Sequence, residues 1–86
     1  MATIEIYTKA FCGYCARAKA LLDRKHAIYR EIDVTMDRAG YDAMVARANG
    51  GRTVPQIFID DRHVGGSDDL AALEAKGELD ALLKAD

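Results

Sequence analysis

The sequence predicts one small α/β domain with its elements in the order β-α-β-α-β-β-α. The 86 residues suffice for one domain and are too few for two. Short apolar or alternating segments are separated by helix-forming segments, and no linker, repeat or low-complexity stretch interrupts them. The helical segments between the first three strands leave room for crossovers. The three-residue link between the last two strands instead requires an antiparallel hairpin.

The first half of the chain supplies two strands and the first helix. Residues 3–8 alternate between isoleucines on one face and Glu-Tyr positions on the other, which is typical of a strand. Residues 9–13 form a loop. Residues 14–25 are rich in alanine and leucine and end in basic side chains, which favours a helix. Residues 28–34 are predicted to form the second strand.

The second helix is defined by its ends and by one apolar stripe. Thr35 or Asp37 can cap its N-terminus, and the Asn-Gly-Gly run at 49–51 is typical of a left-handed C-terminal cap. The stripe consists of Met44, Val45 and Ala48.

The last third of the chain predicts a hairpin followed by helix. Residues 56–59 form the third strand, residues 60–62 a turn, and residues 63–64 begin a short fourth strand. Ser67 is the predicted N-cap of a helix that runs to about Lys76, since two aspartates follow in its first turn. One or two helical turns with Leu79, Leu82 and Leu83 close the chain. The predicted core positions are Leu21, Leu22, Met44, Val45, Ile57, Ile59, Leu70 and Leu73.

Composition excludes several function classes. The net charge is −2 and the isoelectric point about 5.6, whereas a nucleic-acid-binding domain usually has a clustered basic face and a high isoelectric point. The longest uninterrupted apolar runs have four residues, too few to span a membrane. The N-terminus lacks the pattern of a signal peptide, so we expect a cytoplasmic protein.

Two cysteines, Cys12 and Cys15, are the main chemical feature of the chain. A single close pair is not a disulfide framework, because small secreted scaffolds need several bridges. The pair lies where the first strand gives way to the first helix, and this i to i+3 spacing brings both sulfurs to one side. A redox pair is the leading interpretation. Half of a zinc site or coincidence remain as alternatives, and the other zinc ligands would have to be His26 and His63.

The surroundings of Cys12 favour its thiolate. Residues 1–25 carry a net charge of +3, whereas residues 60–86 carry −5. Cys12 is predicted at a helix N-terminus, where amide N–H groups and the helix dipole face its sulfur. Lys9 precedes it in the loop. A positive environment of this kind stabilises a thiolate, which is the nucleophile in thiol–disulfide exchange.

Three motifs in order give the chain a family resemblance: Cys-Gly-Tyr-Cys at 12–15, Thr-Val-Pro at 53–55 and Gly-Gly-Ser-Asp at 65–68. With them the chain resembles the glutaredoxins, most of all the short bacterial dithiol type, and the resemblance covers essentially the whole chain. It implies a thioredoxin-like fold, a four-stranded mixed sheet with helices on both faces. It also implies glutathione-dependent reduction of protein disulfides and protein–glutathione mixed disulfides.

The resemblance also implies the roles of individual residues. Cys12 would be the exposed nucleophile and Cys15 the more buried resolving thiol. Pro55 would follow a cis peptide bond, and Val54 would present its backbone N–H and C=O to the cysteine of glutathione. The remaining residues implied to bind glutathione are Lys9, Tyr14, Thr53, Gln56, Gly66, Ser67 and Asp68.

The charged ends of glutathione have implied partners of their own. Lys9, with Gln56 as a second candidate, would meet the glycine carboxylate. The amides of Ser67 and Asp68 would hold the γ-glutamyl carboxylate, an anion at a helix N-terminus. The Asp68 carboxylate would meet the γ-glutamyl amine, and Tyr14 would flank the tripeptide.

Two departures from the family pattern keep an alternative open. Gly13 stands where many members have proline, and non-proline dithiol sites resemble those of members that bridge a [2Fe–2S] cluster between two chains with glutathione as a further ligand. Ser67 stands where relatives often have a further cysteine, so no third thiol is present. The alternative function is therefore a cluster carrier or store, with Cys12 as the metal ligand.

Other redox classes fit less well. Thioredoxin has a tryptophan before its CxxC where this chain has Phe11, and the monothiol class has serine where this chain has Cys15. A redoxin served by thioredoxin reductase in place of glutathione is a further alternative. We expect a monomer whose partners are glutathione and oxidised proteins. The family offers ribonucleotide reductase as an acceptor, although no residue here selects it.

Overall fold

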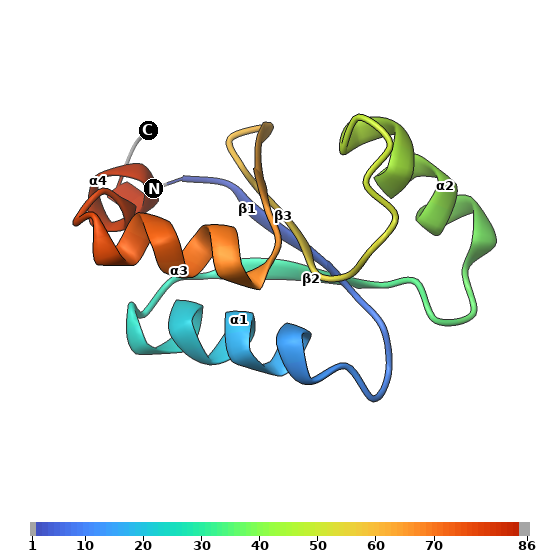
Figure 1. Cartoon of the computed structure of the whole chain (residues 1–86), viewed down its shortest axis with the longest axis horizontal. Helices are drawn as coiled ribbons and strands as arrows, with labels where there is room; N and C mark the ends of the chain where they lie inside the picture. The colour runs from blue at the N-terminus through green and yellow to red at the C-terminus, as the bar shows by residue number, and fades with distance from the viewer. Residues whose placement is uncertain (1, 85–86) are drawn as a thin grey trace.

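A four-stranded mixed sheet forms the centre of the molecule in the computed structural model, which describes residues 2–84 (Figure 1). Its strand order is β2-β1-β3-β4. β1 (Ile4–Thr8) pairs in parallel with β2 (Tyr29–Asp33) and antiparallel with β3 (Gln56–Ile59). β3 pairs antiparallel with β4 (Arg62–Gly65). The predicted mixed sheet and its closing hairpin are confirmed.

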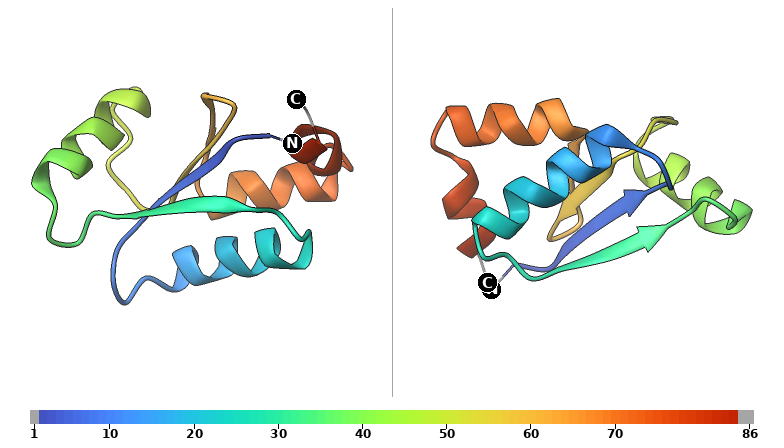
Figure 2. Two further views of the ribbon diagram at one scale, coloured as in Figure 1. Left: turned by 180° about the vertical axis from the view of Figure 1, so that it is seen from behind. Right: turned by 90° about the horizontal axis from the view of Figure 1, so that it is seen from below.

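Helices cover both faces of this sheet. α1 (Gly13–Arg24), α3 (Ser67–Ala75) and the short α4 (Leu79–Lys84) lie on one face, and α2 (Arg38–Arg47) lies on the other (Figure 2). In the part of the chain that the structure describes, no helix is long and apolar enough to cross a membrane.

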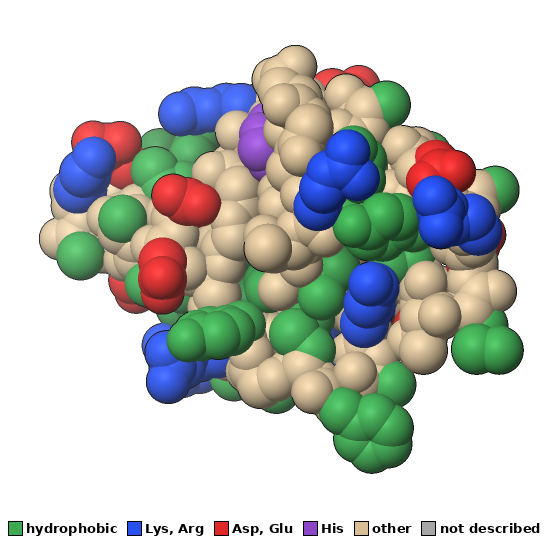
Figure 3. Space-filling view, turned by 45° about the vertical axis from the view of Figure 1, so that its right-hand side comes forward, with side chains coloured by type: hydrophobic (Ala, Val, Ile, Leu, Met, Phe, Trp, Pro, Cys, Tyr) green, Lys and Arg blue, Asp and Glu red, His purple; other side chains and the backbone are tan. Residues whose placement is uncertain are grey.

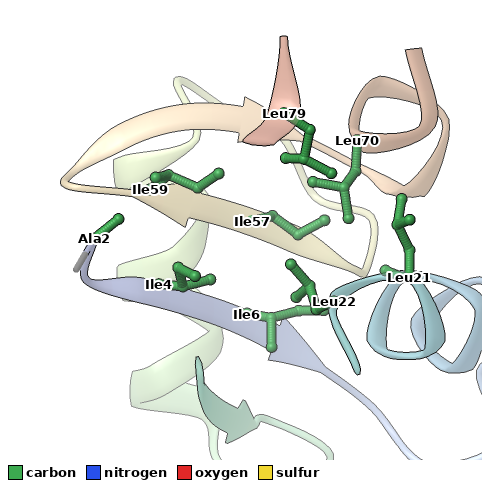
Figure 4. Close-up of a cluster of buried hydrophobic side chains, with 10 residues drawn as sticks. Ala2, Ile4, Ile6, Leu21, Leu22, Ile57, Ile59, Leu70 and Leu79 are labelled. Carbon is green, nitrogen blue, oxygen red and sulfur yellow. The ribbon is translucent and has the colours of Figure 1, made fainter. Parts of the chain in front are cut away.

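The larger core lies between the sheet and the three helices on its first face. The alternation in β1 sends Ile4 and Ile6 into this cluster, where they meet Leu22 of α1 and Leu70 of α3 (Figure 4). Six of the eight predicted core residues are buried, and Val45 and Leu73 are partly buried. At the end of the sheet where β1 begins, the amide of Ala2 donates a 3.3 Å hydrogen bond to the carbonyl of Leu83, which joins β1 to α4.

The second core lies under α2. Its buried members are Tyr7, Val34, Met44, Ala48 and Phe58. Arg47 of α2 closes this cluster, since its guanidinium lies 4.0 Å from the ring centroid of Phe58 and donates to the Tyr7 hydroxyl at 2.9 Å. The same guanidinium pairs with Glu5 at 2.9 Å and with Asp61 at 3.1 Å. These contacts attach the C-terminal turn of α2 to β1 and to the β3–β4 turn.

Two predicted boundaries are corrected by the structure. The β3–β4 link has only two residues, because Asp60 and Asp61 adopt φ values of 51° and 64°, as in a tight hairpin turn. β4 therefore already begins at Arg62. The N-cap of α3 is Gly66, not Ser67, because the Gly66 carbonyl accepts the first helical hydrogen bond, from Leu70.

The structure shows which of the two candidate residues, Thr35 or Asp37, caps the N-terminus of α2. Asp37 is the N-cap, and its carboxylate accepts a 2.9 Å hydrogen bond from the amide of Gly40. The Thr35 side chain points elsewhere and binds the loop before α1. Beyond α2, Asn49 and Gly50 both have positive φ, as the predicted left-handed cap requires.

Candidate active site

Cys12 is the N-cap of α1, which begins one residue earlier than predicted. Its backbone is extended, with φ −110° and ψ 106°, and its Sγ accepts a hydrogen bond from the amide of Cys15 at 3.1 Å. A thiol thus occupies the position where serine or aspartate usually caps a helix. The first amides of α1 have no helical acceptor, and the sulfur of Cys12 serves as the acceptor for one of them, the Cys15 amide.

The loop that carries Cys12 is fastened to β2. The Thr35 hydroxyl accepts a 2.8 Å hydrogen bond from the amide of Ala10 and donates to the carboxylate of Asp33 at 2.6 Å. Phe11, the next residue of the loop, has a φ of 58° and a fully exposed side chain. The loop therefore turns sharply and leaves Cys12 partly exposed.

Cys15 differs from Cys12 in its environment. Both side chains are unpaired thiols, but Cys15 is only 2% exposed. Burial away from water, with a hydrogen bond to Cys12 as the next cause, raises the pKa of Cys15 to about 11. Cys15 is therefore a protonated, shielded thiol at neutral pH.

We expect iodoacetamide at pH 8 to label Cys12 and to leave Cys15 unmodified in the folded protein. A thiol with a pKa of about 11 is ionised in only about one molecule in a thousand at this pH, and its burial blocks access as well. Peptide mass spectrometry after a timed reaction measures both rates. Both cysteines should react in urea, and equal rates in the folded protein would contradict the assignment.

A cavity of about 520 Å³ opens beside Cys12, a size that suits a small ligand. The Cys12 Sγ lies 3.8 Å from the carbonyl oxygen of Val54, which lines this cavity. The peptide bond between Val54 and Pro55 is cis, as predicted. Eight of the nine residues predicted to bind glutathione line the cavity: Tyr14, Thr53, Val54, Pro55, Gln56, Gly66, Ser67 and Asp68.

The N-terminus of α3 forms another part of the cavity wall. The amide of Gly66 donates to the Asp69 carboxylate at 2.9 Å. The amides of Ser67 and Asp68 belong to the first helical turn, whose N–H groups have no helical acceptor. The helix dipole adds a partial positive charge here. This wall is therefore suited to an anionic group.

Lys9 lies outside this cavity. Its ammonium group is 4.5 Å from the ring centroid of Tyr41, beside a second depression of about 310 Å³. Arg17 lies over the Tyr14 ring at 5.6 Å, and Lys19 pairs with Glu31 at 3.1 Å. The basic side chains near the cysteines thus contact aromatic or acidic groups. Figure 3, seen from the side of α2 and of the loop before α1, shows lysine and arginine side chains beside exposed hydrophobic ones.

His63 lines the cavity, although the sequence suggested it only as a candidate zinc ligand and not as part of the glutathione site. It lies in β4, where the hairpin register pairs it with Phe58 of β3. The rings of His63 and Phe58 stack at 5.1 Å, and His63 Nε2 lies 2.7 Å from Oε1 of Gln56. His63 belongs to none of the three motifs. The register of the β3–β4 hairpin brings it beside Phe58 and Gln56.

A partly exposed cysteine that caps a helix, a shielded second thiol one turn later and an adjacent cis-proline loop define a thiol–disulfide oxidoreductase of the thioredoxin-like fold. The glutaredoxin family model matches residues 4–64. The chain is 54% identical to glutaredoxin 3 of Escherichia coli over 84 residues, which cover 98% of this chain and 100% of that protein. It is also 54% identical over 82 residues to the probable glutaredoxin ssr2061 of Synechocystis, covering 95% and 93% of the two chains.

Solved structures agree with this assignment. The solution structure of glutaredoxin from Brucella melitensis is 54% identical, with a TM-score of 0.86 and coverage of 98% of this chain and 90% of that one. The crystal structure of a buckwheat glutaredoxin–glutathione complex is 33% identical, with a TM-score of 0.85 and coverage of 95% and 76%. The chain belongs to the glutaredoxin family, whose members are glutathione-dependent thiol oxidoreductases.

Proposed function

We propose that the protein reduces protein–glutathione mixed disulfides and protein disulfides, with glutathione as the co-substrate. The observation that carries this proposal is the continuity of one cavity from the cis-proline loop beside Cys12 to the N-terminus of α3. A thiol nucleophile and a wall suited to an anion lie at its two ends. Glutathione, a thiol with a carboxylate at each end, matches both.

In the proposed complex the cysteine of glutathione pairs with the backbone of Val54, and its sulfur faces Cys12. The γ-glutamyl carboxylate accepts hydrogen bonds from the amides of Ser67 and Asp68, while the Asp68 carboxylate meets the amine. Tyr14, Thr53, Pro55 and Gly66 form the walls. Lys9 reaches the glycine carboxylate by swinging away from Tyr41. Gln56 is less available for this contact, because both ends of its amide are bonded within the chain.

The reaction proceeds by two thiol–disulfide exchanges. The Cys12 thiolate attacks the glutathione sulfur of the mixed disulfide, and the substrate protein leaves as a thiolate that takes up a proton. Cys12 is then disulfide-bonded to glutathione. The thiolate of a second glutathione attacks the bound glutathione sulfur, releases glutathione disulfide and restores Cys12.

Protein disulfides require Cys15. After Cys12 has attacked one sulfur of the substrate, Cys15 loses its proton and attacks the Cys12 sulfur. The substrate leaves with both sulfurs reduced, and a Cys12–Cys15 disulfide remains for glutathione to reduce. The hydrogen bond from the Cys15 amide to the Cys12 Sγ, at 3.1 Å, holds the two residues in one helical turn for this step.

A mixed-disulfide assay tests the proposal. A glutathionylated peptide is mixed with reduced glutathione and the protein, and formation of glutathione disulfide is followed. We expect turnover that saturates with the peptide. Turnover supported by thioredoxin reductase but not by glutathione would favour the alternative redoxin and overturn the proposal.

A [2Fe–2S] cluster held by two chains is the second candidate function, and Gly13 is the observation that favours it. Gly13 directly follows Cys12, and a Cβ at Gly13 would meet nothing within 4 Å. One chain does not suffice, since residues 2–84 contain no group of three or more metal-ligating His, Cys, Asp or Glu side chains. Four cluster ligands would require one Cys12 from each of two chains and two glutathione thiolates.

Anaerobic reconstitution with iron, sulfide and glutathione tests this second function. A coloured dimer on gel filtration, absent for Cys12→Ser, would support it, and a colourless monomer would remove it.

For the oxidoreductase we propose a cytoplasmic monomer, since glutathione keeps thiols reduced in that compartment. Ribonucleotide reductase is one candidate protein substrate. It can be tested by using its oxidised form in place of the glutathionylated peptide in the glutathione-dependent assay.

A further inference from the structure

The side chain of Gln56 packs against the loop of residues 53–55, which lines the cavity beside Cys12. Gln56 is 5% exposed, and its Nε2 donates to the carbonyl oxygen of Thr53 at 3.0 Å. The fit under the loop is close, because a Cβ on Gly51 would come within 3.1 Å of this nitrogen. The amide group of Gln56 therefore supports the segment that leads into Val54 and Pro55.

The direction of these hydrogen bonds follows from the chemistry of the groups. A backbone carbonyl only accepts, so the nitrogen of the Gln56 amide must face Thr53, and the oxygen must face His63. His63 Nε2, 2.7 Å from that oxygen, must then carry a proton and donate it. A single chain of hydrogen bonds thus runs from the His63 ring through Gln56 to the Thr53 carbonyl.

The ring of His63 is supported by the second core. Its ring stacks on Phe58 with an interplanar angle of 28°, and the guanidinium of Arg47 lies against Phe58 at 4.0 Å. Phe58 is 1% exposed, so this support belongs to the second core. The orientation of Gln56 is therefore fixed from the core through His63, although His63 stands on an edge strand.

We propose that His63 and Gln56 are positioning residues that set the Thr53–Val54 backbone for binding of the glutathione moiety. This inference rests on the proposed function, in which the Val54 backbone pairs with glutathione. His63 acts through Gln56 and takes no part in the exchange of sulfurs. Loss of its N–H donor should weaken binding of the glutathionylated substrate and leave the chemical step intact.

Two replacements of His63 separate its donor from its ring. His63→Phe keeps a ring that can stack on Phe58 but has no N–H, whereas His63→Gln loses the ring and keeps a donor at the reach of Nε2. With the glutathionylated peptide, His63→Phe should raise KM by about 3- to 10-fold, the range expected for one lost hydrogen bond, with kcat within about twofold. His63→Gln should stay close to the wild type.

A double-mutant cycle tests whether His63 acts through Gln56. Gln56→Leu should raise KM by at least as much as His63→Phe, and adding His63→Phe to Gln56→Leu should cause little further change. An unchanged KM for His63→Phe would overturn the inference. The same fold-increase from His63→Phe in both backgrounds would also overturn it, because it would show that His63 acts independently of Gln56.

Control measurements separate this inference from the proposed function. Urea unfolding of each variant checks folding, and His63→Leu replaces His63→Phe if the latter does not fold. Absence of glutathione-dependent turnover by the wild type would refute the proposed function. Wild-type turnover with no KM effect in these variants would refute only the role of His63 and Gln56.

Discussion

Cys12→Ser is expected to lower turnover of a glutathionylated peptide by about 10³-fold or more, because a serine hydroxyl does not replace a thiolate as nucleophile. The variant should fold normally. Cys12 is the N-cap of α1 and accepts from the Cys15 amide, and serine is a preferred residue at such a position. The mixed-disulfide assay and urea unfolding, made on the same preparation, measure both effects.

Cys15→Ser is the matched control for this prediction. It removes the buried thiol but leaves Cys12 and the cavity in place. We expect it to retain removal of glutathione from the peptide and to lose reduction of a protein disulfide, which needs the second thiol. Retention of activity by Cys12→Ser would disprove the mechanism, and loss of both activities by Cys15→Ser would disprove the division of roles.

Gly65→Ala should destabilise the fold by about 2–4 kcal/mol, through backbone strain and loss of a helix cap. Gly65 has a φ of 116°, and a Cβ there would clash with the carboxylate of Asp69. Asp69 would have to move away and would lose its hydrogen bond with the amide of Gly66. The free energy of unfolding in urea gives the size of the effect.

Gly13→Ala is the matched control for this second prediction. Gly13 is the first residue of α1, lies outside the positive-φ region, and has open space where a Cβ would stand. Its replacement should change stability by less than about 1 kcal/mol. Asp69→Ala removes the cap alone, so comparison with Gly65→Ala isolates the strain. Equal stability of Gly65→Ala and Gly13→Ala would show that Gly65 carries no constraint.

Local patterns predicted most of the fold because they agree with one another. The alternation around Ile4 and Ile6 specifies a strand with one face in the larger core, and the structure places it there. The short link after Ile59 allowed only a hairpin. The cis bond before Pro55 needed the family resemblance, since nothing in the isolated residues distinguishes cis from trans.

The details that sequence did not supply depend on contacts between distant segments. The cap of α3 falls on Gly66 because the Asp69 carboxylate reaches back to its amide, a choice that residue preferences alone assign to Ser67. The link from His63 to Gln56 depends on the pairing of β3 with β4. The place of Lys9 over Tyr41 joins the loop before α1 to α2, which lies on the other face of the sheet.

The hydrogen bond between Ala2 and Leu83 has a practical consequence for building redox probes. It brings these two residues together where β1 begins, whereas Cys12 follows the other end of that strand. A fluorescent protein or a surface tether attached near either residue would therefore stand at the far end of the sheet from the Cys12 sulfur (Figure 1). Such a fusion should report on the thiol without blocking its substrates.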